Sequence, residues 1–81
     1  MLLTTERWKH ILDGHPELAM HEDGVLRAVE APTEARPGRE PGEEWFYLRD
    51  AGPSRWLKVV VLFEGSTKGR IITAFPRRRK P

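Results

Sequence analysis

The sequence predicts one small α+β domain, with N-terminal helices packed on a three- to four-stranded antiparallel β-sheet. Two observations indicate this fold class. Apolar residues recur at helical spacing in residues 5–31, whereas residues 43–75 contain β-branched and aromatic runs that short turns separate. The chain has 81 residues, a length that suits one domain with a single hydrophobic core. We place the domain at residues 1–76 and a basic tail at residues 77–81.

The charged residues are divided unevenly along the chain. The formal net charge is +2. Residues 1–45 contain 5 basic and 10 acidic side chains, whereas residues 46–81 contain 9 basic and 2 acidic ones. We therefore expect the C-terminal half to form a positive surface that attracts anions.

The sequence lacks the marks of a secreted or membrane-bound chain. It contains no cysteine, which excludes a disulfide framework and a thiolate zinc site. Its longest apolar run, residues 59–63, is far too short to span a membrane, and residues 1–3 are too few for a signal peptide. We expect a soluble cytoplasmic protein with no membrane partner.

Two helical segments should precede the sheet. Thr4 can cap a helix that begins near Thr5, and Gly14 can supply the left-handed residue that often ends a helix. The apolar face of this helix consists of Trp8, Ile11 and Leu12. Pro16 then starts a second segment that runs to residue 31, as one helix or as two short ones, because Gly24 weakens its middle.

The second half should form the sheet. Residues 32–42 contain three prolines and two glycines, so they hold at best a short edge strand before a loop. Strand-like runs follow at residues 43–49, 55–63 and 70–75. Their short connections predict antiparallel neighbours, and the strongly apolar middle run should lie between the other two.

Three histidines are the first candidates for chemistry. His10, His15 and His21 all lie in the helical half, and an imidazole titrates near neutral pH, which suits proton transfer. Their spacing does not place two metal ligands on one helix face, so we expect no metal and no cofactor. The alternative is that each is a cap or surface residue, which is the interpretation we adopt for His21.

Lys58 and Thr73 are candidates on the strands. Lys58 interrupts an apolar run, where a buried cation needs a partner or an open polar face. If the last hairpin pairs Phe63 with Arg70, Lys58 and Thr73 become diagonal neighbours on one face of the sheet. Threonine is also a good strand former, so Thr73 has a purely structural explanation as well.

Three arginines that flank the strands, Arg49, Arg55 and Arg70, could form a phosphate-binding surface or serve solubility alone. The nearby aromatic residues either stack on bases or pack in the core. They are Trp45, Tyr47 and Trp56. We include Tyr47 with the arginines in the predicted RNA-binding set.

Residues 6–18, ERWKHILDGHPEL, resemble the helix and His-Pro-Glu signature that opens a group of small bacterial and phage proteins. That group has been linked to the barnase, EndoU, colicin and RelE-like (BECR) ribonuclease superfamily. Further similar pieces are residues 25–29, the aromatic strand that ends at Arg49, and residues 57–61 and 72–75. The resemblance spans most of the chain, but its motifs are short, and residues 32–42 and the basic tail depart from the pattern.

The resemblance implies helices on a four-stranded antiparallel sheet and metal-free RNA cleavage on the exposed sheet face, in proteins that often act as toxins or phage effectors. By position, His10 and His15 match the helix-borne histidines. Arg49 and Lys58 match the cationic strand positions, and Thr73 matches the hydroxyl near the last strand.

We therefore predict a metal-independent endoribonuclease. His15 or His10 would act as general base or acid, and Lys58 and Arg49 would hold the phosphate while Thr73 donates a hydrogen bond to it. The expected partners are RNA, with tRNA as one candidate, and an antitoxin or immunity protein. Two alternatives stay open: an inert module that binds nucleic acid or a partner, and a toxin held in a complex by an acidic antitoxin.

Overall fold

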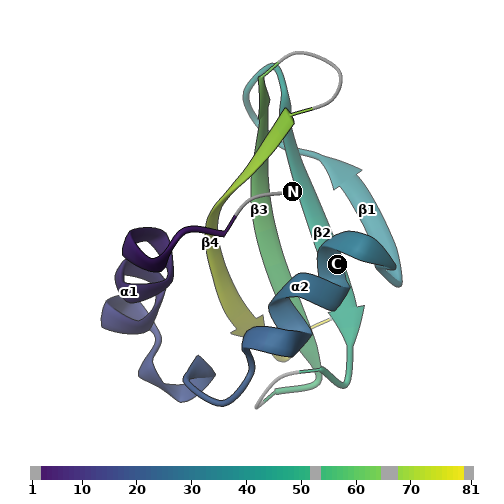
Figure 1. Ribbon diagram of the computed structural model, residues 1–81. Coiled ribbons are helices and arrows are strands. Elements are labelled where there is room, and N and C mark those ends of the chain that lie inside the picture. The colour runs from purple at the N-terminus through teal and green to yellow at the C-terminus, as the bar shows by residue number, and fades with distance from the viewer. Residues whose placement is uncertain (1–2, 52–53, 65–67, 80–81) are drawn as a thin grey trace.

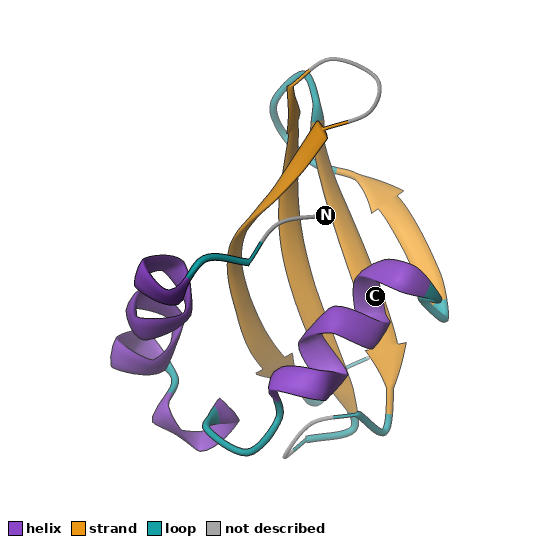
Figure 2. Cartoon of the chain, viewed as in Figure 1, coloured by secondary structure: helices purple, strands orange, loops and turns teal. Residues whose placement is uncertain are grey.

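The computed structural model describes residues 3–51, 54–64 and 68–79, and of Lys68 the backbone alone. Its elements are α1 (Thr5–Gly14), the 3₁₀ turn η1 (Pro16–Leu18), α2 (Glu22–Glu30), β1 (Glu34–Pro37), β2 (Glu43–Arg49), β3 (Trp56–Glu64) and β4 (Lys68–Arg77) (Figure 1). The strands form one antiparallel sheet in the order β1-β2-β3-β4, so the predicted α+β class is confirmed (Figure 2). No helix in the described part of the chain is long and apolar enough to cross a membrane.

The start of α1 follows the prediction, but its end does not. The Thr4 hydroxyl accepts a hydrogen bond of 3.1 Å from the backbone N–H of Arg7, so the helix begins at Thr5. The expected left-handed conformation of Gly14 is wrong, because Gly14 is the last helical residue and its φ is not positive. The chain leaves the helix at His15, with a φ of −140°, because a residue that precedes proline avoids the helical region.

The second helical segment is divided, although not at Gly24. The turn η1 ends at Leu18, and α2 begins only at Glu22. Gly24 lies inside α2 and is buried against the loop that follows β2. A Cβ atom at Gly24 would lie 2.5 Å from the carbonyl oxygen of Ala51, so only glycine allows this approach.

We expect Gly24→Ala to destabilise the domain by about 1–3 kcal/mol, because the added methyl group overpacks this contact. Helix propensity alone would favour alanine by about 1 kcal/mol. A lower free energy of unfolding in Gly24→Ala would therefore show that the contact with Ala51 outweighs helix propensity. Gly14→Ala is the matched control, since a Cβ there meets nothing within 4 Å. Urea unfolding measures both variants, and equal stability of the two would contradict the contact.

The strands confirm most of the expected sheet. The predicted edge strand exists as β1, and β2 has the expected bounds. The strand β4 runs to Arg77, so the first residue of the predicted basic tail is part of the sheet. Residues 80–81 of the predicted tail, and residues 52–53 and 65–67 of the predicted turns, lie outside the described residues.

The hairpin of β3 and β4 contains a bulge. The expected pairing of Phe63 with Arg70 is wrong, because Phe63 pairs with Gly69 and Leu62 pairs with Arg70. The pairing then skips Ile72, which adds one residue to β4. Such a bulge bends its strand and increases the local twist.

Beyond the bulge, the register is the one expected from the sequence. Lys58 pairs with Phe75, and Val60 pairs with Thr73. Because side chains alternate across a sheet, Lys58, Thr73 and Phe75 share one face. Lys58 and Thr73 are therefore diagonal neighbours, as predicted.

The two faces of the sheet have different surroundings. The face that packs on the helices forms the core, with Ile11, Leu18, Val25, Ala28, Phe46, Leu57, Val59, Val61, Ile71 and Ala74. In Figure 1, α2 crosses in front of β2 and β3, and α1 lies beside β4. We call the opposite side of the sheet the open face. It presents Trp45, Tyr47, Trp56, Lys58, Thr73, Phe75 and Arg77.

Candidate active site

Lys58 is at the centre of the open face. Its side chain is only 9% exposed. The Nζ atom lies 3.5 Å from the ring centroid of Trp45, 5.3 Å from that of Phe75 and 5.7 Å from that of Tyr47. We call these three rings the aromatic cage. Aromatic faces attract a cation without neutralising its charge.

The ammonium group of Lys58 makes no hydrogen bond and no ion pair with any residue that the structure describes. No fully enclosed side-chain nitrogen in this part of the chain lacks a hydrogen bond, so Nζ itself must reach the solvent. Lys58 is thus a largely buried cation whose contacts within the described chain are aromatic rings, with no hydrogen bond or ion pair.

The surroundings of Lys58 make its ammonium group easier to deprotonate than that of an exposed lysine. Burial lowers the pKa of this lysine below its ordinary value of 10.5, and the positive charges of Arg77 and Arg39 lower it further. Glu43 raises the pKa, with the smallest effect of the four. An anion bound next to Lys58 would relieve this surplus of positive charge.

Glu43 connects the aromatic cage to the loop before β2. Its carboxylate accepts a hydrogen bond of 2.6 Å from the indole N–H of Trp45 and one of 3.2 Å from the backbone N–H of Arg39. These bonds fix the Trp45 ring over Lys58. They also anchor the backbone of Arg39, one of the two arginines whose charge acts on Lys58.

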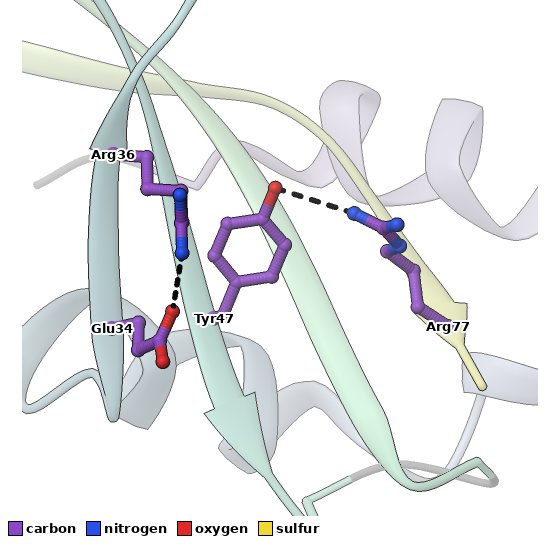
Figure 3. Close-up of polar contacts among 4 residues, drawn as sticks. All are labelled: Glu34, Arg36, Tyr47 and Arg77. Atoms are coloured by element: carbon purple, nitrogen blue, oxygen red, sulfur yellow. Dashed lines mark hydrogen bonds and ion pairs between the residues drawn. The ribbon is translucent and has the colours of Figure 1, made fainter. Parts of the chain in front are cut away.

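Tyr47 is buried between Arg77 and the ion pair of Arg36 and Glu34. It is 1% exposed, and Arg77 donates a hydrogen bond of 3.4 Å to its hydroxyl oxygen while the guanidinium carbon lies 5.7 Å from its ring centroid. On the other side of the ring is the ion pair of Arg36 and Glu34, at 3.2 Å (Figure 3). Tyr47 therefore packs against the charged side chains around it, and it has little exposed surface on which an RNA base could stack.

His15 reaches the site at the edge of β4. Its ring stacks on Phe75, with the centroids 5.7 Å apart and an interplanar angle of 27°. Its Nδ1 atom lies 3.1 Å from a carboxylate oxygen of Glu17. In the tautomer in which Nδ1–H donates to Glu17, Nε2 has a free lone pair and can accept a proton. Phe75 thus contacts both His15 and Lys58.

The remaining predicted catalytic residues are divided. Thr73 is partly buried on the open face, diagonally next to Lys58. His10 is exposed on α1, and within the described chain it makes no hydrogen bond, ion pair or ring contact. His21 precedes α2 without capping it through its side chain. Lys58 and Thr73 thus lie together on the open face, His15 is connected to it through Phe75, and His10 makes none of these contacts in the described chain.

The predicted RNA-binding arginines lie in two places. Arg49 and Arg55 line one pocket next to Trp56, at the end of the open face. Arg70 is near the hairpin tip, where it forms an ion pair with Glu64 and lines a different groove with Thr4.

Several residues at this site were not predicted. Arg77 continues the alternation of Thr73 and Phe75, which would place it on the open face. The sequence assigned it to the basic tail instead, because further basic residues follow it. The role of Glu17 was detectable from its place two residues after His15. Arg39 lies in an irregular loop, and no local pattern indicates that its charge acts on Lys58.

The open face and its edge hold three kinds of side chain that phosphodiester cleavage can use. They are the imidazole of His15, the Lys58 ammonium with its lowered pKa and the guanidinium of Arg77. No family model matches this chain, and no curated protein and no solved structure matches it either.

Proposed function

We propose that this domain is a metal-independent ribonuclease of the BECR type that cleaves RNA on its open face. The main support is Lys58, an unpaired ammonium that is nine-tenths buried and shares Phe75 with a histidine. Burying a cation without an anionic partner costs stability, so such a group is uncommon unless it has a function. A buried titratable group with a perturbed pKa, as Lys58 has, is found preferentially at active sites.

The proposed reaction is attack of the RNA 2′-OH on the adjacent phosphate. Nε2 of His15 takes the proton from the 2′-OH as the new O2′–P bond forms. Lys58 donates a proton to O5′ as the P–O5′ bond breaks, which gives a 2′,3′-cyclic phosphate and a free 5′-OH. A lysine whose pKa is lowered is a better acid for this step than an ordinary lysine.

Two further side chains would stabilise the transition state. The guanidinium of Arg77 compensates the charge that develops on the phosphate, and the Thr73 hydroxyl donates a hydrogen bond to a non-bridging oxygen. Arg77 takes the role that the sequence assigned to Arg49, because its charge acts on Lys58. An acidic antitoxin or immunity protein that covers the open face, and a cytoplasmic location, stay predictions.

The test is cleavage of total RNA and of tRNA by the purified protein in excess chelator, with the ends of the products identified. We expect 2′,3′-cyclic phosphate and 5′-OH ends. The control is the same RNA with a single 2′-deoxy substitution at the mapped site, which should resist cleavage there. Binding that weakens steeply with salt but yields no product would contradict the ribonuclease and favour an inert binding module.

A further inference from the structure

A positively charged pocket lies at the end of the open face, two residues along β3 from Lys58. It is an open pocket of about 420 Å³, lined by Thr33, Glu34, Arg49, Arg55, Trp56 and Arg78. Its three arginines come from three separate segments: the end of β2, the residue before β3 and the residue after β4. The fold therefore gathers these charges at one end of the sheet.

The charges in this pocket are only partly balanced. Arg49 lies 3.8 Å from the carboxylate of Asp50, and Glu34 is paired with Arg36. The side chains of Arg55 and Arg78 make no hydrogen bond or ion pair with any described residue. Two exposed guanidinium groups are thus available to an anion, and guanidinium binds phosphate through paired hydrogen bonds.

The pocket lies close to the Lys58 site along β3. Its indole wall, Trp56, is 5% exposed and precedes Lys58 by two residues on the same face of β3, so the two backbone positions lie about 6.8 Å apart along the strand. Arg77 pairs with Trp56 in the sheet, and its charge acts on Lys58. Positive charge therefore extends from Lys58 over Arg77 to Arg78. A groove of this kind can follow the backbone of a single strand.

We propose that this pocket binds a second phosphate of the RNA strand, next to the phosphodiester that is cleaved at Lys58. The inference rests on the proposed function and defines its substrate further. An RNA with a single phosphodiester occupies the Lys58 site alone. A strand with one more phosphate also occupies the pocket. Arg55 and Arg78 form hydrogen bonds to that second phosphate. The pocket thus contributes affinity for the RNA backbone and takes no part in proton transfer.

The test uses dinucleotides with one phosphodiester, either without a terminal phosphate or with one at the 5′ or the 3′ end. We expect one terminal phosphate to raise kcat/KM by about 10- to 100-fold in the wild type, which is the range of a charged hydrogen bond. In the double variant Arg55→Gln/Arg78→Gln, this ratio should fall close to one. The matched control Arg7→Gln/Arg79→Gln removes the same charge outside the pocket and should keep the ratio.

A ratio near one in the wild type for both terminal phosphates would overturn the proposal, as would a ratio that the Arg55→Gln/Arg78→Gln variant retains. The same comparison is made for binding, with 2′-deoxy dinucleotides that cannot be cleaved. A terminal-phosphate effect on binding that depends on Arg55 and Arg78, in a protein that cleaves no RNA, would retain the pocket and reject the ribonuclease.

Discussion

Lys58→Met should make the domain more stable and abolish its cleavage of RNA. Methionine has a similar length, and its thioether can keep the contacts with the aromatic cage. It removes the cost of burying the ammonium and the repulsion from Arg77 and Arg39. We expect a gain of about 1 kcal/mol, or about 4–8 °C in Tm, as is typical when strain at a functional site is relieved. Loss of the proton donor should lower kcat by at least about 10²-fold.

The gain in stability should depend on pH. Because the pKa of Lys58 is lower in the folded state than in the unfolded chain, the unfolded chain binds more protons in the window below 10.5, and wild-type stability rises with pH through this window. The advantage of Lys58→Met should therefore be complete at neutral pH and shrink as the pH approaches 10.5. Urea unfolding of both proteins at several pH values measures the difference.

Lys9→Met is the control for this pH series, because Lys9 is exposed on α1. Its stability relative to the wild type should show no comparable change with pH. A Lys58→Met variant that is less stable than the wild type at neutral pH would show that the cage contacts of the ammonium outweigh its burial. A folded Lys58→Met variant that cleaves RNA at the wild-type rate would remove Lys58 from the mechanism.

His15→Ala should lower kcat by about 10²–10⁴-fold, whereas His10→Ala should leave it unchanged. His15 stacks on Phe75 next to Lys58, and loss of a general base typically costs a factor of this size. His10 is exposed on α1 and makes no hydrogen bond, ion pair or ring contact in the described chain. Single-turnover cleavage of one defined RNA by the two variants measures the difference.

The role of His15 as a base also predicts chemical rescue. Free imidazole in the buffer should restore part of the rate of His15→Ala. Glu17→Gln should retain the imidazole but weaken its orientation, with a smaller loss. A folded His15→Ala protein with wild-type cleavage, or a loss of activity in His10→Ala, would contradict the assignment.

Features set by local pattern were predictable from the sequence. The strand β2 has the expected bounds because Gly42 and Asp50, which flank it, both have positive φ values of 82° and 57° and end the extended backbone. The start of α1 was predictable because the Thr4 cap needs only neighbouring residues. The α+β order likewise follows from a change of hydrophobic period along the chain.

Features set by tertiary contacts were not predictable. Gly24 looks like a weak point in a helix, and only its contact with Ala51 shows why glycine is needed. The bulge was hidden because Ile71 and Ile72 are both apolar, so the alternation of β4 has no visible break at this point. The choice between His10 and His15 likewise depends on where the chain leaves α1.

The bulge at Ile72 divides β4 into two parts, and the alternation of side chains between the two faces of the sheet starts anew after it. Ile71 and Ala74 both point into the core although they are three positions apart, which a regular strand does not allow. A shift in the pairing of the strand residues before the bulge, from Lys68 to Ile71, can therefore leave Thr73, Phe75 and Arg77 on the open face. Deletion of Ile72 would make the side chains of β4 alternate regularly along the whole strand, so one part of the strand would turn its core residues towards the open face. The loss of this one residue would therefore set the packing of the core against the placement of Thr73, Phe75 and Arg77.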